Sequence, residues 1–315
     1  MLVSILITSY NYGDYIAAAI DSALNQTYKP IEVIVVDDGS TDTSRAIIAS
    51  YGHRIVAYYQ TNGGPNLALN TAFANSHGDL VCLLDADDIF ENTKVQAMVD
   101  AALHFPRAYM FHHQMQMIDA TGAALHPPFP RHIPSGDLRR QVARAGGWFP
   151  HALTSGISFR RSYLEDLFPL PPAWDVTVGA RPHTVPLGAD TYLAVPAALV
   201  APVVGVRQVL ARYRAHKTNR SIAFIENPEL QLIRYMAEHE ALRCVMRRIL
   251  GKAVDLRLDQ HLGYQFARCA AGDVSRASTA VRVMRSEVLP LRVRCREALR
   301  VCANRGVSRR DRVSG

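Results

Sequence analysis

Five aspartates in two short clusters are the residues of this chain best suited to bind a cation. Asp37 and Asp38 follow one apolar run, and Asp85, Asp87 and Asp88 follow another. Short apolar runs bounded by turn residues are typical of buried strands in parallel sheets, which bind ligands beyond the carboxyl ends of their strands. Crowded carboxylates repel one another unless a cation lies among them, and oxygen ligands suit Mg²⁺ or Mn²⁺. The sequence therefore predicts a divalent-metal site that carries a diphosphate at one edge of a sheet.

The spacing of Asp85 and Asp87 suits a shared ligand. Side chains alternate along an extended segment, so two aspartates separated by one residue point the same way. Such a pair can contact one metal ion and a ribose hydroxyl, while phosphate and water complete the metal's shell. An acidic cap of the following helix is the structural alternative. Asp88 can instead accept hydrogen bonds from backbone donors where the chain turns.

Residues after the first apolar run could hold a nucleoside. Tyr10 offers an aromatic face for stacking a base, and Thr8 and Asp38 offer hydrogen-bonding groups for its edge. A carboxylate accepts from an imide N–H such as that of uracil. Asp-Gly-Ser is also common in turns, so a structural role for Asp38 stays open.

The first hundred residues alternate between strand and helix patterns. We expect strands at 3–8, 31–36, 54–60 and 79–84 and helices at 14–25, 40–51, 65–76 and 93–105. This alternation predicts an α/β fold with a mainly parallel sheet and flanking helices. The proline-rich stretch 120–187 is either a set of binding loops or a rigid filler, and a helical period follows from 228.

Length and composition fit one large α/β domain with a smaller helical one. We expect domains at 1–225 and 226–304 of the 315 residues, with a disordered basic tail at 305–315. The start of the sequence lacks the features of a secretory signal, and the apolar stretch 193–206 is too short and proline-broken to span a membrane. The five cysteines are expected to be free thiols. These features predict a cytoplasmic protein, at most peripheral to the inner face of the plasma membrane.

Positive charge is concentrated near the C-terminus. Residues 281–315 hold ten arginines against three acids, which accounts for the net charge of +7 of the whole chain. Arginines interleaved with apolar residues are typical of segments that dock on an anionic membrane, and a solvated helix face is the alternative. We expect no nucleic-acid partner, because no aromatic platform accompanies the charge.

Four segments are similar, in order and spacing, to glycosyltransferase family 2, namely 4–11, 22–27, 36–42 and 84–88. The resemblance implies a GT-A fold and a metal-dependent, inverting transfer from a nucleotide-sugar donor. Thr8, Tyr10 and Asp38 match the positions that hold the nucleoside, and Asn11 lies beside them. Asp85 and Asp87 match the pair that binds ribose and metal.

Three later segments also resemble the family. Segment 62–70 is similar to the glycine-rich stretch near the donor and contains Asn66, although Leu69 stands where many members have arginine. Asp190 matches the general base, with Ala189 in place of the usual first acid. The 213–219 segment matches the end of the domain and implies that His216 or Arg214 contacts the diphosphate or the metal.

The function expected from these features is a metal-dependent inverting glycosyltransferase. The donor is expected to be UDP-linked, with dTDP and GDP as alternatives, and the acceptor a glycan or lipid-linked hydroxyl in surface or exopolysaccharide synthesis. A sugar nucleotidyltransferase is an alternative, but it needs a glycine-rich phosphate loop where residues 8–13 stand. A non-catalytic nucleotide-binding protein is the other. The absence of GxGxxG after the first strand argues against a dehydrogenase.

Overall fold

The computed structural model describes residues 1–178, 180–216, 227–251, 253–286, 289 and 291–302, which form two compact units. The first unit is made of Met1–Phe129, Ala152–Pro172 and Val203–His216. The second unit is made of Pro130–His151, Ala173–Pro202 and the described part of Lys217–Gly315. The predicted domain boundary at 225 and the predicted disordered tail at 305–315 lie outside the described residues.

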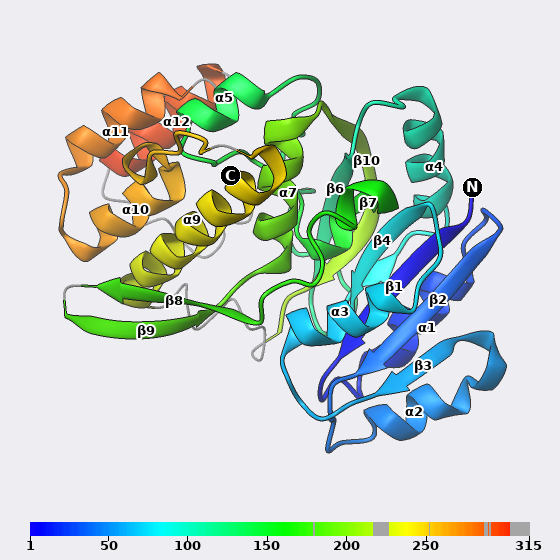
Figure 1. The fold of residues 1–315 in the computed structure, drawn as a ribbon. Coiled ribbons are helices and arrows are strands. Elements are labelled where there is room, and N and C mark those ends of the chain that lie inside the picture. The colour runs from blue at the N-terminus through cyan, green and yellow to red at the C-terminus, as the bar shows by residue number, and fades with distance from the viewer. Residues whose placement is uncertain (179, 217–226, 252, 287–288, 290, 303–315) are drawn as a thin grey trace. The chain divides into compact units, whose positions relative to one another are not determined.

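The first unit is built on one eight-stranded sheet with the order β3-β2-β1-β4-β7-β6-β10-β5 (Figure 1). Its strands are β1 Val3–Ser9, β2 Ile31–Asp37, β3 Val56–Tyr59, β4 Leu80–Asp85, β5 Ile89–Phe90, β6 Met110–Ile118, β7 Ile157–Arg160 and β10 Val203–Arg214. β2 is parallel to its neighbours β1 and β3, and β1 is also parallel to β4. β6 and β10 form another parallel pair. β7 is antiparallel to β4 and β6, and β5 is antiparallel to β10. The predicted α/β class with a mainly parallel sheet is confirmed.

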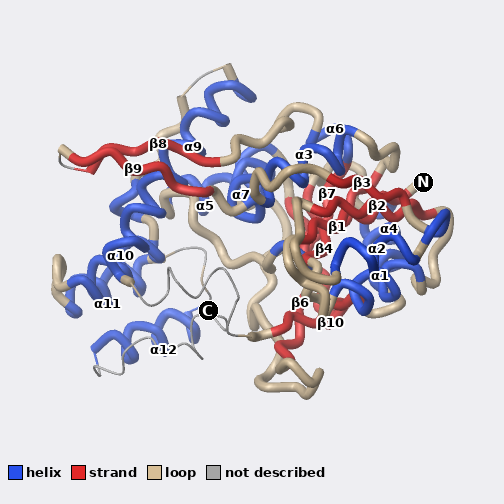
Figure 2. Tube along the Cα trace, turned by 90° about the horizontal axis from the view of Figure 1, so that it is seen from below, coloured by secondary structure: helices blue, strands red, loops and turns tan. Residues whose placement is uncertain are grey.

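Helices cover both faces of this sheet, with α3 and α6 on one side and α1 and α2 on the other (Figure 2). Their bounds are α1 Ile16–Leu24, α2 Ser44–Ser50, α3 Pro65–Ala74, α4 Lys94–His104 and α6 Arg161–Leu164. α1 buries Ile16, Ala19, Ile20 and Ala23, which recur with the period of a helix. Burial of each of the two isoleucine side chains contributes roughly 1.5–3 kcal/mol to the stability of the fold. This burial holds the carboxyl edge of the sheet in a fixed place.

The strand register brings the two aspartate clusters to the same edge. Thr8 of β1 pairs with Val36 of β2 on one side and with Asp85 of β4 on the other. Ser9 pairs with Asp37 in the same way. β1 therefore lies between the two strands that carry the carboxylates, and both clusters lie at one edge of the sheet, as predicted.

The second unit is mainly helical. It contains α5 Arg139–Arg144, the hairpin β8 Ala173–Val178 and β9 Arg181–Pro186, α7 Ala189–Val200, α9 Pro228–Leu250, α10 Leu262–Ala271, α11 Arg276–Arg285 and α12 Leu291–Cys302. α9 packs against α7 and β8, and it begins where Asn227 Oδ1 accepts the backbone N–H groups of Glu229 and Leu230. Helices α10, α11 and α12 share an apolar cluster that includes Leu262, Val283 and Val301.

The cysteines and the lengths of the helices were also subjects of prediction. All five cysteines are free thiols, and Cys82 is buried in β4. In the part of the chain that the structure describes, no helix is long and apolar enough to cross a membrane.

Candidate active site

Asp87 and His216 are in direct polar contact at the carboxyl edge of the first unit. Asp87 lies just after β4, His216 lies just after β10, and His216 Nε2 is 2.8 Å from Asp87 Oδ2. The two side chains are only 7% and 8% exposed. Asp85 is partly buried at the end of β4, two residues before Asp87. The fold thus joins the predicted metal pair to the predicted histidine across more than a hundred residues of sequence.

Aromatic rings fix the position of His216. The ring centroids of Tyr12 and Tyr15 lie 5.8 and 5.2 Å from that of the histidine. The Arg214 guanidinium lies 5.0 Å from the centroid of Tyr15. Burial, followed by the charges of Asp87, Asp85 and Asp88, raises the pKa of the Tyr12 hydroxyl. Tyr12 therefore lies beside Asp85, Asp87 and Asp88. It was not predicted as a site residue, although its position in the loop after β1 could have indicated it.

Asp88 plays a different part from its neighbours, because it points into the protein. Its side chain is 1% exposed. Oδ2 accepts the Ser155 hydroxyl at 2.6 Å, and Oδ1 accepts the Arg214 N–H at 2.9 Å. Burial and the charges of Asp87 and Asp85 raise the pKa of the Asp88 carboxyl. The backbone-bonding role considered for Asp88 from the sequence agrees with this contact.

Asp38 holds the glycine-rich segment in place. Its Oδ1 accepts Gln60 Nε2 at 2.7 Å and the Gly63 N–H at 3.0 Å, and its Oδ2 accepts the Gly64 N–H at 2.8 Å. The residue is 3% exposed. Three of its roughly four acceptor positions are therefore used within the protein. A direct nucleoside contact by Asp38 stays a prediction.

The remaining residues of the first loop form the rim of this edge. Asn11 has a left-handed φ of 56°, and its Oδ1 accepts the Thr41 N–H at 2.8 Å. Its own N–H donates to Ser40 Oγ at 2.9 Å, so Asn11 joins the loops after β1 and β2. Tyr10 is 46% exposed, which leaves its ring free for stacking. Thr8 is in register with Asp85.

Asn66 and Asn70 on α3 hold the chain at 170–171. Asn66 Nδ2 donates to the Pro171 carbonyl at 2.7 Å. Asn70 donates to the Leu170 carbonyl at 2.9 Å and accepts the Leu170 N–H at 2.7 Å. Asn66 is 2% exposed, and its Oδ1 has no hydrogen-bond partner among the described residues. A contact between Asn66 and the nucleotide-sugar donor stays a prediction.

Asp190 lies in the second unit, in the first turn of α7. The helix begins at Ala189, and Gly188 is its N-cap. Asp190 Oδ1 accepts the Thr191 N–H at 2.8 Å. A Cβ on Gly188 would lie 2.8 Å from Asp190 Oδ1 and 3.5 Å from Arg234 Nη2, so the carboxylate and the guanidinium flank the same glycine. Arg234 Nε also donates to Glu238 Oε1 at 2.7 Å.

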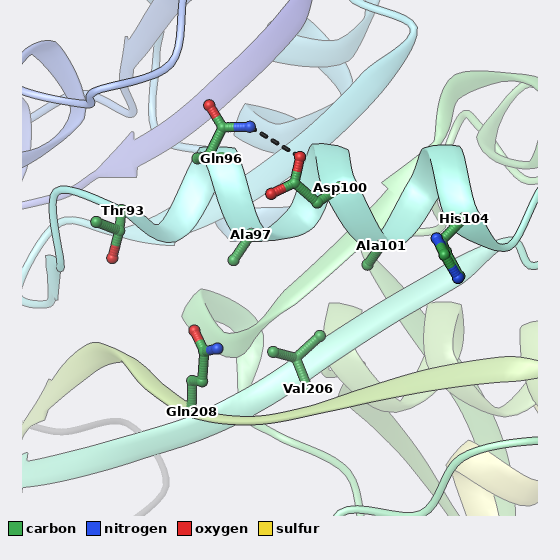
Figure 3. Close-up of a pocket in the computed structure, with 8 residues that line it drawn as sticks. All are labelled: Thr93, Gln96, Ala97, Asp100, Ala101, His104, Val206 and Gln208. Carbon is green, nitrogen blue, oxygen red and sulfur yellow. Dashed lines mark hydrogen bonds between the residues drawn. The ribbon is translucent and has the colours of Figure 1, made fainter.

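A surface pocket of about 440 Å³ lies between α4 and β10 of the first unit (Figure 3). Its lining is Thr93, Gln96, Ala97, Asp100, Ala101, His104, Val206 and Gln208. None of these is a predicted site residue. The carboxyl edge of the sheet with Asp85, Asp87, Asp88 and His216, here called the acidic edge, concentrates the charged and aromatic groups. It is therefore the stronger candidate for an active site.

The donor atoms at the acidic edge fit a divalent cation that is also bound by its substrate. In the described residues no three His, Cys, Asp or Glu side chains converge into a complete protein-made metal site. Two carboxylates and one imidazole nevertheless lie at neighbouring positions, and Mg²⁺ or Mn²⁺ commonly takes few protein ligands and completes its shell with phosphate and water. The residues fit such an ion when a diphosphate accompanies it.

Comparisons with known proteins identify a family and a fold. The model of glycosyl transferase family 2 matches residues 4–168. An uncharacterized glycosyltransferase of Nostoc sp. is 31% identical over 229 residues, which cover 71% of this chain and 67% of that protein. One of Rickettsia typhi is 46% identical over 99 residues, which cover 31% of each chain.

Two solved structures share the architecture of the chain. Residues 1–349 of S. aureus TarS, in complex with UDP-GlcNAc, align with a TM-score of 0.55 and 14% identity over 95% of this chain and 90% of that one. The mannosyltransferase PcManGT of Pyrobaculum calidifontis, in complex with GDP-Man and Mn²⁺, aligns with a TM-score of 0.52 and 18% identity over 96% of this chain and 85% of that one. At these identities the likeness is one of fold, and it confirms the expected GT-A architecture.

Proposed function

The chain belongs to glycosyltransferase family 2 and has a GT-A fold, and on this basis we propose that it transfers a sugar from a nucleotide-diphosphate donor to a hydroxyl with inversion and with a divalent metal. The observation that carries the proposal is the 2.8 Å contact between Asp87 and His216 at the carboxyl edge, beside Asp85. Buried acidic and imidazole groups at that edge suit a charged diphosphate and its cation.

Asp85, Asp87 and His216 would hold the metal, either Mn²⁺ or Mg²⁺. The bound ion supplies Lewis-acid stabilisation of the charge that grows on the leaving diphosphate. The complex of PcManGT with GDP-Man and Mn²⁺ supports a divalent ion together with a nucleotide sugar. The aromatic rings of Tyr12 and Tyr15 keep the imidazole oriented.

Residues of the first unit would bind the nucleoside. Tyr10 stacks on the base with its exposed ring, and Thr8 hydrogen-bonds next to it. Asp38 and Asn11 shape the surrounding loops through the hydrogen bonds described above. Asn66 contributes its buried Oδ1 near the glycine-rich segment. UDP is the first candidate nucleotide, as in the TarS complex with UDP-GlcNAc, and GDP and dTDP are the alternatives.

Asp190 would act as the general base. Inversion requires the acceptor hydroxyl to attack the anomeric carbon in line with the departing nucleotide, and a carboxylate within about 3 Å of that hydroxyl takes its proton. The transition state is expected to resemble an oxocarbenium ion, as in glycoside hydrolysis. The acceptor is proposed to be a glycan or a lipid-linked hydroxyl in surface or exopolysaccharide synthesis. The arginine-rich C-terminal residues are proposed to contact an anionic membrane.

Ligand binding and turnover by the full chain and two variants test the proposal. We expect one nucleotide sugar to raise the melting temperature only when Mn²⁺ or Mg²⁺ is present. Asp87→Ala should abolish this response, whereas Asp190→Asn should keep it and lose transfer. Absence of stabilisation by UDP-, GDP- and dTDP-sugars would contradict the donor assignment. Normal turnover by Asp190→Asn would contradict the base assignment, and a wild-type protein that binds donor without any transfer would favour the non-catalytic alternative.

A further inference from the structure

The aspartates proposed to hold the metal lie in a tight turn whose ends are bridged by one buried hydroxyl. The turn runs from Asp85 to Asp88 and is closed by the Asp88 N–H donating to the Asp85 carbonyl at 3.0 Å. Ser155 Oγ accepts the Asp85 N–H at 3.0 Å and donates to Asp88 Oδ2 at 2.6 Å. A single side chain therefore fixes the amide of the first residue and the carboxylate of the last.

The same carboxylate links the turn to the strand that carries the histidine. Asp88 Oδ1 accepts the Arg214 N–H at 2.9 Å, and Arg214 Nε donates to the Asp87 carbonyl at 3.0 Å. His216 follows two residues after Arg214. The chain of hydrogen bonds from Ser155 through Asp88 to Arg214 therefore joins the segments that carry Asp85, Asp87 and His216.

Packing leaves the bridging serine little freedom. Ser155 is fully buried in the 3-10 turn Thr154–Gly156 before β7. A Cβ on Gly156 would lie 2.4 Å from the Ala152 Cβ and 2.8 Å from the Met115 sulfur. No side chain fits there without displacing its neighbours, so the turn is held against β6 and the hydroxyl cannot easily move away from Asp88.

We propose that Ser155 is a positioning residue for the metal site, acting through Asp88 to hold Asp85, Asp87 and His216 at their mutual distances. This inference rests on the proposed metal-dependent function. Ser155 itself does not contact the metal, because its hydroxyl is committed to the turn. Residues that orient metal ligands typically change metal affinity by about 10–100-fold when they are removed.

The matched control for Ser155→Ala is Ser158→Ala. Ser158 lies in adjacent β7 and is also fully buried, but its hydroxyl donates to Cys82 Sγ at 3.2 Å and not to the acidic turn. Mn²⁺ binding to the full chain, followed by electron paramagnetic resonance of the free ion with and without UDP, separates the two. We expect Ser155→Ala to weaken Mn²⁺ binding by at least about tenfold and Ser158→Ala to leave it within about twofold.

A double-mutant cycle tests whether Ser155 acts through Asp88. If it does, the effects of Ser155→Ala and Asp88→Asn on Mn²⁺ affinity are not additive. Equal affinities of the two serine variants, or a folded Asp88→Asn variant with wild-type affinity, would overturn the inference while leaving the metal site intact. A wild-type protein that binds no Mn²⁺ even with UDP would instead overturn the proposed metal-dependent function itself.

Discussion

Four of the five aspartates at the sheet edge show how the surroundings of a residue decide its use. Asp38 and Asp88 are nearly fully buried and accept hydrogen bonds from the protein, so they build the loops. Asp87 faces an imidazole, and Asp85 keeps partial exposure. The clustering was predictable from the sequence because each of the two clusters directly follows an apolar run. The division of roles was not, since the partners Gly64, Ser155 and Arg214 are distant along the chain.

Removal of His216 should weaken metal binding without preventing folding. His216→Ala takes away one nitrogen donor and the partner of Asp87 Oδ2, so Mn²⁺ affinity should fall by roughly 10–100-fold. Isothermal titration with Mn²⁺ and UDP measures the change. His77→Ala is the control. His77 is an exposed histidine that contacts Glu32, which lies at the start of β2 and therefore at the opposite end of that strand from Asp37. Unchanged affinity in His216→Ala would exclude His216 from the site.

Gly188 should be needed to place the proposed base. An alanine Cβ at this position would lie 2.8 Å from Asp190 Oδ1, closer than real Cβ atoms come, so the carboxylate must move. A displacement of about 1 Å can cost roughly 10²-fold in rate. Gly188→Ala should therefore lower kcat strongly while the KM for the donor stays near that of the wild type. Steady-state kinetics decide, and a wild-type kcat would show that Asp190 tolerates the displacement.

The elements with a clear period were predictable, and the irregular ones were not. α1 and α4 start and end within two residues of expectation, because apolar positions recur at helical spacing. β7 was missed: it has four residues, lies after the proline-rich stretch and pairs antiparallel between β4 and β6. Nothing in so short a run marks its partner, since pairing depends on two strands far away in sequence.

The clamp between α3 and the chain at 170 should contribute measurably to stability. Asn70→Ala removes two hydrogen bonds to the backbone of buried Leu170 and leaves its N–H and carbonyl without these partners. Each buried group left unsatisfied costs about 1–3 kcal/mol, so the loss of both partners should lower the free energy of unfolding by about 2–6 kcal/mol. Urea denaturation measures this fall. Asn75→Ala, which loses a single bond to Thr71 within the same helix, should cost less, and an equal loss would contradict the clamp.

The helical unit should lose stability in acid through His261. Its Nδ1 accepts the Tyr264 N–H at the start of α10, and burial, then the charges of His239 and His151, lower the pKa of His261 to about 3. The pKa of a histidine in the unfolded chain is about 6.5. Between these values the unfolded chain binds the extra proton, so this stabilisation is complete above about pH 6.5 and is lost by about 1.4 kcal/mol per unit as the pH falls towards 3.

His261→Asn isolates this contribution from that of the other histidines. Asparagine keeps an acceptor for the Tyr264 N–H and is a favourable helix cap, but it does not titrate in this range. Urea denaturation at pH 7 and pH 5 should show a smaller acid loss for His261→Asn than for the wild type. Identical losses would mean that His261 is not the group that takes up the proton.

At the scale of the whole molecule, the site is assembled from segments that the chain interleaves. Met1–Phe129, Ala152–Pro172 and Val203–His216 together make the first unit, and they supply Asp87, Ser155 and His216 in turn. The first stretch could be predicted in detail, because its strands and carboxylates are adjacent in sequence. The positions of the other two depend on the long-range pairing of β7 with β4 and of β10 with β6, which no local pattern reports.

Charge at the C-terminal end of the chain should direct the protein to anionic lipid surfaces. Arg276 and Arg285 are exposed on α11 together with Val281 and Met284, a combination of basic and apolar groups suited to a headgroup region. Each basic residue near such a surface contributes about 1 kcal/mol, so reversing both charges should weaken binding by at least about 2 kcal/mol, or roughly thirtyfold. Co-sedimentation with phosphatidylglycerol vesicles measures it.

The control for R276E/R285E is R107E/R131E, which reverses two exposed arginines outside α11 and α12. Both double variants change the net charge of the chain by the same amount, so a general electrostatic attraction would weaken equally in the two. A local docking surface predicts a loss for R276E/R285E alone, together with release by high salt, because screening shortens the reach of the arginines. Equal binding to neutral phosphatidylcholine vesicles would contradict a charge-directed contact.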